Sequence, residues 1–208
     1  KKPCRVLSSN AGQCLFTGIV NQKIAKAIKK KLMSKSFYSG WGIRTLADSE
    51  LRYNPMSYHN GSIWPHDNAL IAFGLSRYGF KDAAINIMTG LFDASLFMDC
   101  HRLPELFCGF SRRPSEGPTL YPVACNPQSW ASGAVFLLLQ SCLGINIDSL
   151  EEKIYINKPK LPVYLQEVRV RNLKVGNAKI DINFEYHPED VSIKIFRRSG
   201  NVDVIATK

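Results

Sequence analysis

The feature that most constrains the fold is a change in the period of the apolar residues near residue 145. Before it, apolar residues recur at intervals of three and four, which is typical of amphipathic helices. After it, apolar and polar residues alternate, which predicts about five antiparallel strands, in the segments KIYINKP, QEVRVRNLKVG, AKIDINFEYHP, VSIKIFRRSG and VDVIA. The predicted helices span residues 10–20, 21–33, 64–78, 81–98 and 127–143. The sequence therefore predicts a mainly α part, residues 1–145, followed by a small antiparallel β sheet or sandwich, residues 146–208.

Two long segments between the helices, residues 36–63 and 99–126, lack a clear period. Loops of this length in a compact domain are usually functional or disordered. Both contain many aromatic residues, which disfavours disorder. We therefore expect ordered binding loops.

The composition excludes several classes of partner. Net charge is +10, but many lysines lie on the polar side of the helix over 21–33, where no stacking aromatic accompanies them. A solvated face explains that charge better than nucleic acid does. No apolar run reaches the roughly 18 residues of a membrane span, and the N-terminus lacks the apolar stretch of a signal peptide. The six cysteines form no CxxC pair, which favours reduced thiols in a cytoplasmic protein.

Polar and aromatic residues concentrate at the starts of the helices and in the segments between them. The clearest case is YNPMSYHNGSIWPHDN at 53–68; LPEL at 103–106 and NPQSW at 126–130 are the others. Aromatic faces beside amides and imidazoles suit a sugar, which has apolar C–H faces and a rim of hydroxyls. Two histidines seven residues apart are weak evidence for zinc, so neither a metal nor a cofactor is expected. The candidate substrate-binding residues are Trp41, Arg44, Tyr58, His59, Asn60, Trp64, His66, Asp67 and Trp130.

Several of these candidates also have an ordinary structural interpretation. A lone tryptophan is more often a core residue, although all three here lie at segment starts. Arg44 either binds substrate or pairs with a carboxylate such as Glu105. His66 at a helix start is equally well explained by a hydrogen bond to the backbone. Asp67 lies in a first helical turn, where the helix dipole keeps it ionised, so it suits a hydroxyl-binding or orienting role better than that of an acid.

Five motifs in order along the chain resemble the C-terminal part of bacterial glycogen-debranching enzymes, the amylo-α-1,6-glucosidases. They are SNAGQCLFTGI, GWGIRTL, YNPMSYHNGSIWPHDNALIAFGL, RLPELFCG and NPQSWASGA. The resemblance implies the C-terminal part of an (α/α)6 six-hairpin barrel and hydrolysis of α-glucan branch linkages with inversion. Neutral invertases carry similar pieces, and a non-catalytic carbohydrate-binding fragment is a further alternative.

The resemblance also implies which carboxyl group performs the chemistry. It places the general base at Glu105, whereas the residues alone favour a structural role in which Glu105 caps the following turn or pairs with Arg102. The general acid is expected upstream of this chain; Asp67 and Glu116 are the local candidates for a second carboxyl. Five predicted helices cannot close a barrel, so the chain is expected to be inactive alone. It is expected to self-associate or to bind an upstream barrel half.

Overall fold

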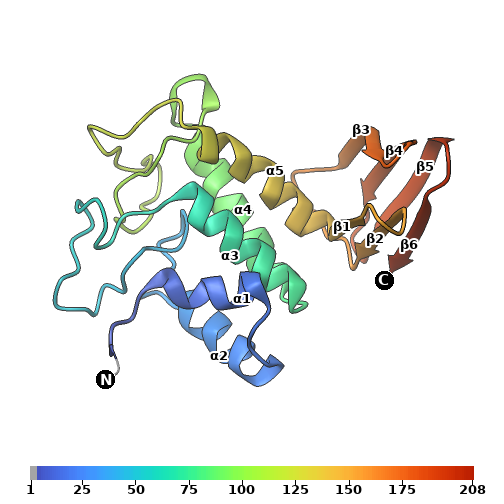
Figure 1. The fold of residues 1–208 in the computed structure, drawn as a ribbon. Coiled ribbons are helices and arrows are strands. Elements are labelled where there is room, and N and C mark those ends of the chain that lie inside the picture. The colour runs from blue at the N-terminus through green and yellow to red at the C-terminus, as the bar shows by residue number, and fades with distance from the viewer. Residues whose placement is uncertain (1–3) are drawn as a thin grey trace. The chain divides into compact units, whose positions relative to one another are not determined.

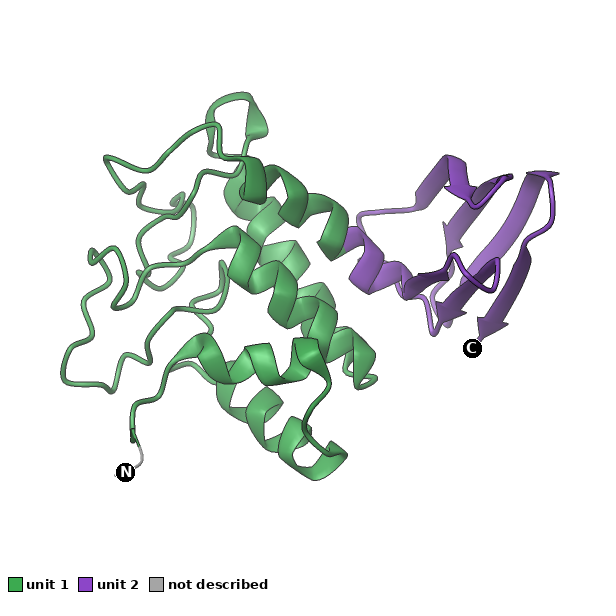
Figure 2. Cartoon of the chain, in the orientation of Figure 1, with its two compact units in different colours: residues 1–138 green, residues 139–208 purple. Residues whose placement is uncertain are grey.

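The structure, a computed structural model, describes residues 4–208, and the chain divides into two compact units, residues 1–138 and 139–208 (Figure 2). The sequence places the boundary at residue 145, after the last helix. The structural division falls inside that helix, α5 (Ser129–Leu143). The reason is that the last turn of α5 contributes Leu143 to the core of the strands.

The first unit is helical (Figure 1). Its elements are η1 (Ser9–Gly12), α1 (Gln13–Thr17), α2 (Gln22–Leu32), α3 (Pro65–Arg77), α4 (Lys81–Ser95), η2 (Asp99–His101) and the first part of α5. The expected helix over 10–20 is thus a 3-10 turn followed by a short α-helix. The helix predicted from residue 127 begins at Ser129.

Local sequence explains where α3 begins and ends. Pro65 occupies the first turn, where a missing N–H costs nothing, and Gly79 follows the helix with φ 81°. Within the helix, Gly74 allows α1 to approach closely, because a Cβ there would lie 2.6 Å from the backbone carbon of Leu15. α3 therefore contacts α1 on one side and α4 on another.

The two long loops are packed against each other by short β-bridges. Ile63 bridges to Arg44 and to Phe107, and Phe107 bridges in turn to Leu120. Ile63 and Phe107 are fully buried. Gly109 makes this approach possible, since any Cβ there would overlap the carbonyl oxygen of Gly61. The loops are ordered, as the sequence predicts.

The second unit contains six strands in two three-stranded sheets. They are β1 (Ile145–Asp148), β2 (Lys153–Asn157), β3 (Glu167–Val175), β4 (Ala178–Tyr186), β5 (Val191–Ser199) and β6 (Asp203–Thr207). The sheet orders are β1-β2-β6 and β3-β4-β5. Apolar residues from both sheets share one core, which includes Ile154, Ile156, Ile180 and Phe184.

Two features of this unit differ from the sequence-based prediction. The short strand β1 was not expected, because four residues carry too little alternation to identify a strand. β6 pairs with β2 in parallel, whereas only antiparallel strands were expected. Alternation identifies a strand and its buried face, but it contains no information on which neighbour the strand pairs with.

No helix between residues 4 and 208 is long and apolar enough to cross a bilayer. Over the same range no disulfide is formed, and no group of three or more His, Cys, Asp or Glu side chains is arranged to hold a metal ion.

Candidate active site

Glu105 is a buried carboxylate with both oxygens engaged. Its Oε1 accepts a hydrogen bond from the Tyr58 hydroxyl at 2.6 Å, and its Oε2 accepts one from the backbone N–H of Cys125 at 3.2 Å. The backbone N–H of Glu105 donates to the Cys125 carbonyl at 2.9 Å. Only 7% of the residue is exposed. Neither Arg102 nor Arg44 is among the hydrogen-bond partners of its carboxylate.

These hydrogen bonds determine the charge of the site. The Tyr58 hydroxyl, followed by the Cys125 N–H, lowers the pKa of Glu105 even though burial acts in the opposite direction. The same bond, with burial and the negative charge of Glu105, raises the pKa of Tyr58 to about 12. At neutral pH the pair is therefore a carboxylate beside a neutral phenol. Such a carboxylate can accept a proton from water but cannot serve as an acid.

Tyr58 connects Glu105 to a cluster of aromatic rings. Its ring meets those of His59, Trp64 and Tyr121 edge-on, with centroids 4.6, 4.9 and 5.7 Å away. The Trp64 Nε1–H donates to Ser62 Oγ at 2.9 Å, which fixes the indole. Edge-on contacts of this kind are favourable for aromatic pairs and hold each ring in one orientation.

His66 extends the cluster from the first turn of α3. Its ring stacks on that of Trp130 at 4.0 Å between centroids, and Trp130 is itself 46% exposed. Burial lowers the pKa of His66, against the smaller opposing effects of Asp67 and Glu105, so the imidazole is neutral at pH 7. Its Nδ1 is buried and has no hydrogen-bond partner. This atom therefore does not form the hydrogen bond to the backbone that would explain His66 as a purely structural residue.

Asp67 is held by the N-terminal helices. Its Oδ2 accepts from Ser9 Oγ at 2.8 Å and its Oδ1 accepts from Gln13 Nε2 at 2.6 Å. Both oxygens are thus already engaged. Asp67 thereby ties η1 and α1 to the start of α3. Its role toward substrate hydroxyls stays a prediction.

Arg44 and Trp41 lie elsewhere. Arg44 is fully buried and donates to the carbonyl of Gly109 at 2.6 Å, to that of Lys35 at 3.0 Å and to Ser111 Oγ at 2.8 Å. Both alternatives for Arg44, a substrate contact or a pair with Glu105, are therefore wrong. The guanidinium instead satisfies backbone carbonyls of the two loops. Trp41 is 2% exposed, and the guanidinium carbon of Arg112 lies over the indole ring, 4.4 Å from the ring centroid.

Six of the seven remaining substrate-binding candidates line one cavity of about 590 Å³, which we call the aromatic cavity; Tyr58 and Glu105 do not line it. Its volume is that of an ordinary small-molecule site. No Lys or Arg within residues 4–208 lines it. The residues with side chains suited to a sugar are Ser9, Asn10, Thr45, His59, Asn60, Trp64, His66, Asp67 and Trp130.

Besides Asn10 and Thr45 in the cavity lining, four residues that contact the predicted ones were not expected. Ser9 and Gln13 hold Asp67, Tyr121 packs on Tyr58, and Cys125 offers its backbone N–H to Glu105. The SNAGQ motif contains the first two and could have indicated them. A backbone donor such as that of Cys125 leaves no signal in the sequence.

Comparison with known proteins supports a glycoside hydrolase domain. The model of the mannosylglycerate hydrolase MGH1-like glycoside hydrolase domain matches residues 1–97, which include the YHNG and WPHDN segments but not Glu105. Among curated protein sequences none matches.

A solved structure shows the same fold. It is the crystal structure of the GH63 mannosylglycerate hydrolase from Thermus thermophilus in complex with glucose, with a TM-score of 0.52 and 18% identity. The match covers 66% of this chain and 30% of that one, so this chain corresponds to less than a third of the other protein's length. Both comparisons name a mannosylglycerate hydrolase, and neither names a debranching enzyme.

Proposed function

We propose that the first unit forms the general-base side of a glycoside hydrolase active site, with Glu105 as the base. The observation that carries this proposal is the buried Glu105 carboxylate, kept ionised by Tyr58 and Cys125. The Tyr58 ring in turn contacts His59 and Trp64, which line the aromatic cavity. Inverting glycosidases need such a carboxylate to activate a water.

The reaction proceeds by direct displacement. Glu105 accepts a proton from a water, whose oxygen bonds to the anomeric carbon as the glycosidic carbon–oxygen bond breaks. A second carboxyl group must donate a proton to the leaving oxygen. Asp67 is occupied by Ser9 and Gln13, and Glu116 pairs with Arg113 at 3.0 Å and lines a different cavity. The acid therefore comes from outside residues 4–208.

For the substrate, we favour a neutral α-glucan branch linkage, as the resemblance to amylo-α-1,6-glucosidases implies. In support, no Lys or Arg of the described chain lines the aromatic cavity to pair with a carboxylate. Mannosylglycerate is the second candidate, because it is named in both comparisons. Sucrose hydrolysis and binding without catalysis remain outcomes of the test.

The helical unit also presents apolar side chains to solvent, among them Phe92, Leu96 and Phe136, which are 43%, 52% and 73% exposed. α5 is apolar on all sides, which is typical of a helix surrounded by protein. This supports packing against another helical segment, supplied by an upstream barrel half or by a second copy.

The test separates the base from the missing acid. Fluoride leaves without protonation, so α-glucosyl fluoride and α-mannosyl fluoride need only the base. We expect the 208-residue chain to release fluoride from one of them while leaving limit dextrin, mannosylglycerate and sucrose intact. Glu105→Gln should lower fluoride release by about 10²–10⁴-fold, the usual contribution of a general base. Added azide, which needs no base, should restore turnover as glycosyl azide.

Glu116→Gln is the matched control, since it removes a carboxylate that lies in another cavity and is paired with Arg113. It should leave fluoride release unchanged. Unaltered release by Glu105→Gln would show that the glutamate is structural. Binding of sugars without any fluoride release would favour the non-catalytic alternative. Turnover of sucrose alone would favour the invertase-like one.

A further inference from the structure

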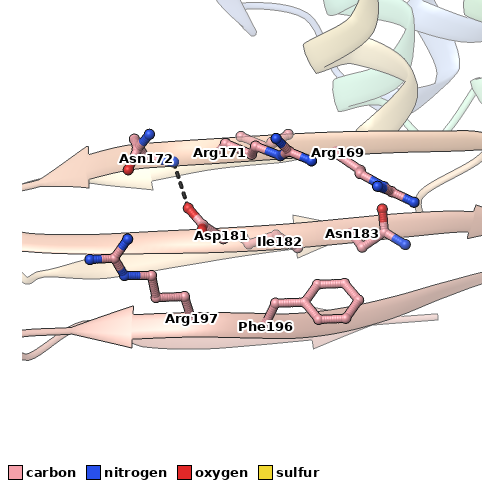
Figure 3. Close-up of a pocket in the computed structure, with 9 residues that line it drawn as sticks. Arg169, Arg171, Asn172, Asp181, Ile182, Asn183, Phe196 and Arg197 are labelled. Atoms are coloured by element: carbon pink, nitrogen blue, oxygen red, sulfur yellow. Dashed lines mark hydrogen bonds between the residues drawn. The ribbon is translucent and has the colours of Figure 1, made fainter.

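The second unit contains a cavity of about 540 Å³ on the face of the β3-β4-β5 sheet opposite the shared core (Figure 3). Its residues come from all three strands, and the register of β3 against β4 shifts at a β-bulge between Val170 and Leu173. We call this cavity the arginine groove. It belongs to a different unit from Glu105 and is independent of the proposed glycosidase chemistry.

Positive charge is unbalanced along this face. At one end each cation has an acid: Arg169 pairs with Glu167 at 2.8 Å and Lys194 pairs with Glu185 at 2.8 Å. At the other end lie four exposed cations, Arg171, Lys174, Lys179 and Arg197, and the one acid among the residues that line the groove is Asp181.

The arrangement at this cationic end costs stability. The Asp181 Oδ1 accepts a hydrogen bond from the backbone N–H of Asn172 at 2.6 Å, so it braces the bulge. Lys174 and Lys179 are directly opposite each other across β3 and β4. Like charges in that position destabilise a sheet. An anion bound beside Arg171 and Arg197 would relieve this repulsion.

A buried acceptor in the groove lacks a partner. Asn183 is 1% exposed and its Nδ2 donates to Glu167 at 2.8 Å and to Glu185 at 3.0 Å. Its Oδ1 has no hydrogen bond. The side chain of Arg169, 57% exposed, extends over Asn183 (Figure 3). A surface ion pair such as Arg169–Glu167 is weak, so a ligand can displace Arg169 and bring a hydroxyl donor to this oxygen.

Phe196 adds an apolar face to the same groove. It is 68% exposed, and it lies next to Arg197 on β5 where the register with β4 shifts. An exposed ring beside arginines is suited to the C–H face of a sugar ring.

We propose that the arginine groove binds a small acidic sugar, a carbohydrate carrying a phosphate or a carboxylate. Arg171 and Arg197 hold the anionic group, Phe196 packs on the ring and Asn183 accepts from a hydroxyl. A single strand of nucleic acid is disfavoured, because it needs several stacking aromatics and Phe196 is the one aromatic residue lining the groove.

Titration calorimetry on the whole 208-residue chain tests this proposal with five probes: glucose 6-phosphate, glucuronate, glucose, inorganic phosphate and a short oligothymidylate. We expect one of the two acidic sugars to bind at least about ten-fold more tightly than glucose and than inorganic phosphate, since charge-assisted hydrogen bonds add to the sugar contacts. Whichever binds more tightly identifies the anionic group. Added salt should weaken binding.

Variants locate the site. Arg171→Gln with Arg197→Gln, and separately Phe196→Ala, should each weaken binding of the acidic sugar by about ten-fold or more. Arg198→Gln is the matched control, because it removes the same charge from the next residue of β5, which pairs with Asp203 at 3.8 Å. It should change the affinity less than about two-fold. Glu105→Gln should have no effect.

Four results would overturn the proposal: no binding, equal affinity for glucose, equal affinity for inorganic phosphate, or tighter binding of oligothymidylate. Unchanged binding in the double arginine variant would also overturn it, because the ligand would then be bound elsewhere.

Discussion

The close crossing of α1 and α3 makes Gly74→Ala a test of how the site is assembled. A Cβ at position 74 would lie 2.6 Å from the backbone carbon and Cβ of Leu15 and from the backbone nitrogen of Phe16. Ordinary carbon contacts are about 3.5–4.0 Å, so α1 must move away by about 1 Å. Since two of these atoms are backbone, no rotamer change relieves the overlap.

The expected magnitude follows from two opposing terms. Overpacking of this kind costs about 1–3 kcal/mol. Replacing a helical glycine by alanine recovers up to about 1 kcal/mol. With the full alanine gain subtracted, the net loss of stability is up to about 2 kcal/mol, which in a chain of this size lowers Tm by up to about 8 °C. Because α1 carries Gln13, its movement should also loosen the hydrogen bond to Asp67 and weaken sugar binding in the aromatic cavity.

Urea and thermal unfolding, followed by circular dichroism, measure the stability, and calorimetry with a neutral sugar measures the binding. Gly133→Ala is the matched control, since it changes a helical glycine whose Cβ would meet nothing within 4 Å. It should stabilise α5 by up to about 1 kcal/mol. Equal effects of the two substitutions on stability would refute the reasoning, because they would show that α1 and α3 separate without cost.

Three further outcomes are expected. Tyr58→Phe removes the hydroxyl that lowers the pKa of Glu105, so the acid limb of fluoride release should move to higher pH, whereas Tyr121→Phe should leave it in place. The pKa of His66 is lowered in the folded chain, so the free energy of unfolding should decrease as pH falls below about 6.5, the usual pKa of histidine in unfolded chains. Urea titrations at several pH values should show a weaker pH dependence for His66→Phe, and an unchanged dependence would contradict this. Phe136→Lys should shift sedimentation toward the monomer, and a wild-type chain that stays monomeric at high concentration would count against self-association.

The sequence by itself determined the elements and their order. The intervals between apolar residues identified all five helices to within a few residues, because burial of one face imposes its period on any helix. Gly79 and Gly144 lie within two residues of the ends of α3 and α5, and both adopt the positive φ that favours glycine at a helix end. Alternation likewise identified the long strands β3, β4 and β5.

The tertiary structure decided which residues meet. Nothing in the sequence distinguishes Arg44, whose guanidinium binds backbone carbonyls, from an arginine that faces a ligand. The parallel pairing of β6 with β2 is equally invisible, because hydrogen bonds between strands use backbone groups that every residue has. The Cys125 N–H that helps to keep Glu105 ionised is also a backbone group, so the sequence could not predict this hydrogen bond. Residue types and spacing reveal which chemistry is available, and only the packing of distant segments determines where it is assembled.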